Sequence, residues 1–277
     1  MPELIHLPFS PWSEKARWAL DARGVDYQRR VYQPLSGELE LRRRLSRWRG
    51  KVSVPLLLDG DRVLGDSFEI ARWADAHGSG PRLFPAGEEQ RIADWDALSE
   101  RGMSAGRVGS LQRMLRDDEA LAELVPPALR GLPGGVTQPL AAIGVRRTLR
   151  KYAGSDTDVV AARGVLASTL EQLRADLAAS TGARSPAGAS TGARSPAEAS
   201  TSTGEPRTLL PEFSYADIVM AQVVFCIAPP QDKMRIGAAS RRAFQEPGLA
   251  ARFSDLVAWR DALYRVHRPE PGGTNGN

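Results

Sequence analysis

The sequence has one cysteine, Cys226, and three histidines among its 277 residues. A single cysteine excludes a disulfide framework within the chain and a cysteine-rich zinc site. The histidines, His6, His77 and His267, are far apart in the sequence, so they form no local metal-binding motif. We therefore expect a functional site without a metal ion.

Long hydrophobic runs are also missing. No apolar stretch approaches the roughly 18–20 residues that span a bilayer, and the N-terminus has no basic region followed by an apolar stretch. We expect no membrane association, and the cytoplasm is the expected location. The net charge is only +4, and the densest basic run, residues 42–44, has just one aromatic neighbour, Trp48. We therefore expect no nucleic-acid partner.

The composition is that of a globular protein, with 42% hydrophobic and 25% charged residues. The length favours about two domains. Hydrophobic periodicity and turn signals in the first part of the chain predict alternating strands and helices. The expected strands are residues 4–7, 27–33, 54–58 and 62–64, and the expected helices are 13–22, 38–48 and 67–77. This order is typical of a thioredoxin-like α/β domain, which we place at residues 1–80.

Helical spacing dominates after a Pro- and Gly-containing linker at residues 79–85. It predicts an all-α domain over residues 85–268, with helices at 88–115, 119–129, 140–152, 158–179, 215–227 and 249–266. One segment, residues 180–206, contains most of a repeated ASTGARSPA sequence and has little apolar surface to bury, so we expect a disordered insertion. The tail at 269–277 is also expected to be disordered.

A serine-containing corner is the first candidate for chemistry. Ser10-Pro11-Trp12-Ser13 follows the first expected strand and opens the first expected helix. A helix N-terminus offers unpaired N–H groups and a partial positive charge, which stabilise an anion. Serine cannot exchange disulfides, but its hydroxyl can donate a hydrogen bond to a bound thiolate. The alternative is that Ser10 and Ser13 only cap the helix.

Two further segments have features that suit a peptide-like ligand. Pro55 stands at the start of a strand, where a cis peptide bond is allowed, and the Val54 backbone is then placed to pair with an extended ligand. Asp66 and Ser67 precede the third helix. Ser67 is favoured as its N-cap, the helix N-terminus suits a carboxylate, and Asp66 suits an amine.

These segments together resemble the glutathione transferase superfamily. The resemblance extends over the whole chain apart from the insertion, and its motifs are residues 9–20, 54–58, 65–70 and 213–218. In the last of them, Ser214 and Asp217 resemble the buried capping box of that family. The resemblance implies a thioredoxin-like domain with a glutathione site, an all-α domain, a homodimer, and an enzyme that conjugates glutathione to small hydrophobic electrophiles.

Each site residue receives a role from this resemblance. Ser10 would hold and activate the sulfur of glutathione, with Ser13 as the alternative. Val54, at the Val54–Pro55 bond, would pair with the cysteinyl backbone. Asp66 and Ser67 would hold the γ-glutamyl end. Lys51 is the candidate for the glycyl carboxylate.

Other functions stay open at this level. The same thiolate would serve a peroxidase, an isomerase or an ether-cleaving enzyme. A non-catalytic binding or interaction protein with the same fold is the alternative from another class. Among the remaining residues, Trp12 is a candidate for the wall of the electrophile pocket, Cys226 is expected in the core, and His267 is expected at the surface.

Overall fold

The computed structural model describes most of the chain, namely residues 1–33, 37–45, 48–49, 52–125, 129, 131–153, 158–182, 206–269 and 274–275. The expected Lys51 contact and most of the repeat insertion lie outside these residues. Within the described part, no helix is long and apolar enough to cross a bilayer.

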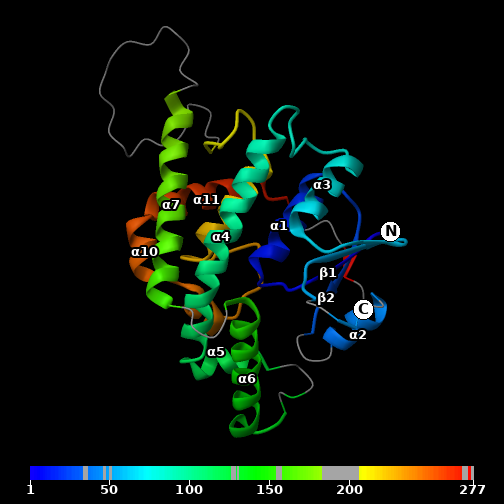
Figure 1. Ribbon diagram of the computed structural model, residues 1–277, viewed down its shortest axis with the longest axis vertical. Coiled ribbons are helices and arrows are strands. Elements are labelled where there is room, and N and C mark those ends of the chain that lie inside the picture. Colours follow the sequence, from blue (N-terminus) through cyan, green and yellow to red (C-terminus); the bar gives the residue numbers. More distant parts are fainter. Residues whose placement is uncertain are drawn as a thin grey trace.

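The N-terminal domain has the expected order of strands and helices. It comprises β1 (Glu3–His6), α1 (Pro11–Ala22), β2 (Gln28–Val31), α2 (Gly37–Arg44), β3 (Leu56–Asp59), β4 (Arg62–Leu64) and α3 (Ser67–His77). With β5 (Thr274–Asn275) from the end of the chain, the sheet order is β4-β3-β1-β2-β5, with β1 parallel to β2 and antiparallel to β3. Helices α1 and α3 pack together on one face, and α2 lies on the other (Figure 1). This is the thioredoxin-like domain that the sequence predicts.

The fifth strand differs from the expected disordered tail. Strand β5 (Thr274–Asn275) pairs in parallel with Gln28 and Arg29 of β2. It covers the edge of β2, whose backbone groups would otherwise be open to another strand. The sequence of this segment has no apolar alternation, so periodicity could not predict a strand there.

The remaining helices form the all-α domain that the sequence predicts. They are α4 (Glu89–Met114), α5 (Asp118–Glu123), α6 (Gly134–Ala153), α7 (Val159–Gly182), α8 (Tyr215–Phe225), α9 (Ala238–Phe244), α10 (Pro247–Arg252) and α11 (Ser254–His267). The long helices α4 and α7 lie side by side (Figure 1). Helix α7 continues past Ser180, where the insertion is expected to begin, and ends at Gly182.

Several helices differ from the expectation. Helix α6 begins at Gly134 and passes through Pro139, although proline disfavours a helix interior. The expected helix at 249–266 is two helices, because Phe253 has a non-helical backbone between α10 and α11. Helix α9 was not expected, and its first turn is held by the Glu123 carboxylate, which accepts from the N–H groups of Ala239 and Ser240 at 2.9 and 2.8 Å.

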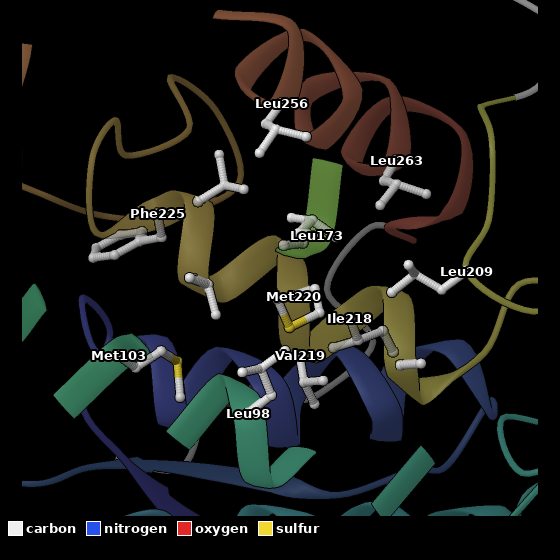
Figure 2. Close-up of a cluster of buried hydrophobic side chains, with 14 of the residues drawn as sticks. Leu98, Met103, Leu173, Leu209, Ile218, Val219, Met220, Phe225, Leu256 and Leu263 are labelled. Atoms are coloured by element: carbon white, nitrogen blue, oxygen red, sulfur yellow. The ribbon is translucent and has the colours of Figure 1, made fainter. Parts of the chain in front are cut away.

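Helix α8 is the centre of the core, and its side chains point both toward α4 and toward α11 (Figure 2). All of its residues are buried. A fully buried helix needs its own solution for the unpaired N–H groups of its first turn. The Tyr215 N–H donates to the Leu83 carbonyl oxygen at 2.9 Å, and the Asp217 N–H donates to the Ser214 side chain. The Asp217 carboxylate in turn accepts from the N–H groups of Ser214 at 2.9 Å and Leu209 at 2.8 Å, which precede the first turn. The expected capping box of Ser214 and Asp217 is confirmed.

Candidate functional site

The strand register brings the three candidate segments to one end of the sheet, where β1 and β4 finish and β3 begins. Ile5 pairs with Leu56, and Leu57 pairs with Leu64. Three pieces of chain therefore meet at this end of the sheet: the one after β1, the one before β3 and the one after β4. These chains contain the serine-containing corner, Val54–Pro55 and Asp66–Ser67, respectively.

The two serines of the corner have different surroundings. Ser10 is the N-cap of α1 and is partly exposed, and its oxygen accepts from the Ser13 N–H at 3.5 Å. Ser13 is completely buried, and its oxygen accepts from the Leu7 N–H at 3.1 Å. Ser13 therefore holds the strand-to-helix turn together. Only Ser10 presents a hydroxyl that solvent and a ligand can reach.

The corner is anchored from behind by a buried arginine. Arg17 donates to the carbonyl oxygens of Leu7 at 3.4 Å and Pro8 at 3.0 Å, which fixes the loop that leads into Ser10. Its guanidinium also contacts Nδ1 of His6 at 2.7 Å and the Glu14 carboxylate at 2.6 Å. Burial, together with the nearby charge of Arg17, lowers the pKa of His6 to about 3. His6 is therefore neutral at pH 7 and accepts from Arg17.

A second network joins the corner to the helical domain. Lys15 is completely buried, and its ammonium lies 2.7 Å from the carboxylates of both Asp96 and Glu100 on α4. Glu100 also accepts from Nε1 of Trp12 at 2.7 Å. Burial raises the pKa of Asp96, and the Lys15 charge opposes that rise. The first helix is thus locked to α4 next to Ser10.

Aromatic rings flank Ser10 on the helical-domain side. The guanidinium of Arg107 lies 3.7 Å above the centre of the Trp12 ring. Phe9 and Phe244 of α9 have ring centres 6.5 Å apart. The role of Trp12 in the wall of an electrophile pocket stays a prediction. Phe244 was missed because it lies on the short helix that the sequence did not predict.

The segment before β3 contains the expected Val54–Pro55 pair. The Val54–Pro55 peptide bond is cis, and β3 begins only at Leu56. Pro55 is buried, whereas Val54 is partly exposed. Among the described residues, none forms a hydrogen bond with the Val54 backbone. That backbone is therefore available for pairing with an extended ligand.

At the third segment the structure corrects one expectation. Asp66, and not Ser67, is the N-cap of α3, because the Asp66 carboxylate accepts from the Phe68 N–H at 2.7 Å. Asp and Ser cap helices equally well, so the sequence could not distinguish them. Ser67 is buried as the first residue of the helix, and Asp66 remains exposed. Asp66 therefore presents a carboxylate to solvent at this end of the sheet.

The remaining candidates take structural positions. Cys226 is buried, as expected, and burial raises the pKa of its thiol to about 12. His267 is not simply a surface residue, because its ring stacks on Phe213 at 4.1 Å and its carbonyl accepts from Nε1 of Trp18 at 2.9 Å. Within the described residues, no group of three or more His, Cys, Asp or Glu side chains could hold a metal ion.

A thioredoxin-like domain followed by an all-α domain, with the first helix packed between them, is the architecture of glutathione transferases. Residues 9–77 match the family model of the glutathione S-transferase N-terminal domain. The match lies within the N-terminal domain and supports the resemblance seen in the sequence.

Solved structures extend the likeness to the whole chain. A glutathione transferase from Phanerochaete chrysosporium has a TM-score of 0.60 at 16% identity, with 97% of this chain and 98% of that chain covered. A glutathione S-transferase from Methylobacillus flagellatus, solved with glutathione bound, has a TM-score of 0.55 at 14% identity, with 96% of each chain covered. A Tau class enzyme from mango, Mangifera indica, has a TM-score of 0.53 at 14% identity, with 98% and 93% covered. No curated protein matches the sequence.

Proposed function

We propose that the protein is a glutathione transferase that conjugates the glutathione thiolate to small hydrophobic electrophiles. The observation that supports the proposal is the partly exposed Ser10 hydroxyl at the N-terminus of α1, at the same end of the sheet as a Val54 backbone that bonds to no other described residue. Ser10 accepts from the Ser13 N–H, so its own O–H remains to donate to a sulfur. The glutathione-bound relative from Methylobacillus flagellatus supports the choice of ligand.

In this proposal the thiol of glutathione lies at the serine-containing corner and its cysteinyl backbone pairs with Val54. The Asp66 carboxylate attracts the γ-glutamyl ammonium, and the N-terminus of α3, which includes Ser67, faces the γ-glutamyl carboxylate. The Ser10 hydroxyl and the N-terminal field of α1 favour the thiolate over the thiol. The thiolate then attacks the electrophilic carbon, a C–S bond forms, and the leaving group departs with its electron pair.

Phe9, Trp12 and Phe244 supply an apolar wall for the electrophile next to the sulfur. Peroxide reduction, isomerisation and ether cleavage begin with the same thiolate. Activity assays with substrates of each kind distinguish these reactions from conjugation. The homodimer and the cytoplasmic location stay predictions of the resemblance. Analytical ultracentrifugation and fractionation of the source cells test them.

The test is a calorimetric titration of the protein with glutathione across pH, in parallel with Ser10→Ala and Ser10→Thr. We expect the wild type and Ser10→Thr to release the thiol proton on binding near neutral pH. Ser10→Ala should bind glutathione without that release, because a hydrogen bond to a charged group is worth about 1.5–3 kcal/mol, or about one to two pKa units. No binding by the wild type at millimolar glutathione would refute the proposal. Binding without turnover on a panel of aryl halides, epoxides and peroxides would favour the non-catalytic alternative.

A further inference from the structure

The outward side of helix α6 is apolar over the first half of the helix. Val136, Leu140 and Ile143 are 53%, 43% and 57% exposed, and their spacing of four and three residues places them on one side of the helix. The opposite side packs inward, because Ala142 and Val145 are buried in one cluster with residues of α4, α5 and α9. A surface helix ordinarily presents polar residues to water. This side of α6 therefore differs from a surface that only meets water.

The second half of the same side is basic. Arg146 and Arg150 lie three and seven residues after Ile143, which keeps them on this side of the helix. Both are exposed, and neither side chain bonds to another residue in the described part of the chain. Helix α6 contains no Asp or Glu, and residues 131–145 contain neither a charged nor an aromatic residue. An uncharged strip is thus followed by positive charge along one helix.

The acidic groups that contact α6 do not cancel this charge. The start of α5 is acidic, but its contact with α6 is made through Gln138, which donates to the Asp118 carbonyl oxygen at 3.5 Å. At about 100° per residue, Gln138 points away from the apolar strip, so α5 lies behind it. Glu38 of α2 is shared by Arg147 at 3.2 Å and Arg42 at 2.8 Å. The two exposed arginines are therefore left to attract an anion.

The position and composition of this side favour a lipid surface as its occupant. Helix α6 lies at one end of the longest axis of the molecule (Figure 1), and Leu132, just before the helix, is 48% exposed. Protein interfaces are anchored by aromatic residues in pockets, and this strip has no aromatic residue. An aliphatic side with adjacent arginines, whose forked N–H groups fit phosphate, is typical of a helix that lies in the plane of a membrane interface.

We propose that the outward side of α6 binds an anionic lipid bilayer. Val136, Leu140 and Ile143 enter the boundary between headgroups and acyl chains, and Arg146 and Arg150 bind lipid phosphates. This peripheral mode needs no membrane-spanning run, so it replaces the expectation of no membrane partner, which came from the length of apolar runs. It goes beyond the proposed function and does not depend on it.

Helix α6 also contacts the chain that enters the candidate site. Lys151 donates to the Val52 carbonyl oxygen at 2.7 Å, two residues before Val54. Docking through α6 therefore brings the bilayer, in which apolar compounds dissolve, to the part of the molecule that adjoins the site.

The test is co-sedimentation of the full chain with vesicles of phosphatidylcholine alone and of equimolar phosphatidylcholine and phosphatidylglycerol. We expect the wild type to bind the mixed vesicles at least about tenfold more tightly, because each arginine near an anionic surface contributes about fivefold. Binding should weaken between about 0.1 and 0.5 M salt. If the wild type binds neither vesicle, the inference is overturned, and a protein partner is left as the occupant. Equal binding to both also overturns it, because the proposed lipid is anionic.

Charge reversal tests the two arginines. Arg146→Glu with Arg150→Glu should remove the preference for the mixed vesicles. The matched control is Arg101→Glu with Arg265→Glu, two exposed arginines on α4 and α11 whose reversal changes the net charge by the same amount. We expect this control to keep most of the preference. Similar losses in both double variants would show attraction by net charge alone and would overturn the assignment to α6.

The apolar strip has a test of its own. Leu140→Gln with Ile143→Gln should weaken binding to the mixed vesicles about fivefold or more, because less apolar surface leaves water on docking. Val160→Gln with Val266→Gln, which replaces exposed valines on α7 and α11, should bind like the wild type. Circular dichroism checks that each variant is folded. A strip variant that is folded and binds like the wild type would refute the role of the strip.

Insertion of the strip can be measured directly with a polarity-sensitive dye. The dye on Ile143→Cys should shift its emission to shorter wavelengths on mixed vesicles, whereas the dye on Val160→Cys should not. The native Cys226 is buried and does not take the dye in the folded protein. An unchanged spectrum at position 143 in the presence of bound vesicles would contradict the inference.

Discussion

Arg268 and Glu14 form a buried ion pair of 2.7 Å that joins the end of the last helix to the first helix. The same guanidinium contacts Asp21 at 2.8 Å, two turns further along the same face of α1. The exposed fraction is 2% for the Arg268 side chain and 0% for both carboxylates. Removal of one partner from such a pair leaves an unpaired charge in the interior.

Substitution of Arg268 by alanine should therefore destabilise the protein strongly. We expect the free energy of unfolding, measured by urea titration, to fall by about 3 kcal/mol or more. The matched control is Arg265→Ala, an exposed arginine on α11, which should change it by less than about 0.5 kcal/mol. Similar losses in both variants would show that the pair contributes little.

The free energy of unfolding should depend on pH because of His6. Its pKa is lowered to about 3 in the fold, mainly by burial, against an unfolded value of 6.5. The unfolded chain therefore binds a proton first as the pH falls, and stability decreases from about pH 6.5 down to about pH 3, by up to about 1.4 kcal/mol per pH unit.

The measurement is urea unfolding at several pH values between 7 and 4, with His6→Asn, which retains an acceptor for Arg17. This variant should show a shallower slope than the wild type. His77→Gln removes an exposed histidine and serves as the control. An unchanged slope in His6→Asn would contradict the prediction.

The two serines of the corner should separate binding chemistry from stability. Ser13→Ala leaves the partly exposed Leu7 N–H without its acceptor, so we expect a loss of about 1 kcal/mol in unfolding free energy. The thiol pKa of bound glutathione should stay as in the wild type, because the Ser10 hydroxyl is retained. Ultraviolet absorbance of the bound thiolate as a function of pH measures it. A shift as large as in Ser10→Ala would reassign the thiolate contact to Ser13.

The carboxylate of Asp217, in the capping box of α8, should contribute to both stability and folding rate. Asp217→Ala removes the acceptor for the buried N–H groups of Leu209 and Ser214. At about 1–3 kcal/mol for each orphaned group, the expected loss is about 2–6 kcal/mol, and we expect slower refolding in stopped-flow fluorescence because the cap forms early. Glu212→Ala, an exposed neighbour, is the control and should leave both quantities unchanged. A loss below about 1 kcal/mol would contradict this account.

Much of the fold could be predicted because it depends on residues that are close together in the sequence. Strands and helices of the first domain follow from apolar periodicity, and Ser10, Val54 and Asp66 each stand next to a recognisable turn or helix start. The contacts of Lys151 and Arg268 could not be predicted. Lys151 is 99 positions from its partner Val52, and Arg268 is 254 positions from its partner Glu14. A local sequence pattern cannot predict contacts between residues so far apart. Helix α9 was missed because its first turn depends on the distant Glu123 carboxylate.

The environment of Cys226 has a practical consequence. It is the one sulfhydryl of the chain, it is buried, and its pKa is raised to about 12. A thiol of that kind is almost entirely protonated at neutral pH and reacts very slowly with disulfides or alkylating agents. Labelling by such reagents is therefore limited by opening of the core around α8. The rate at which the native cysteine is labelled therefore reports how often the core opens.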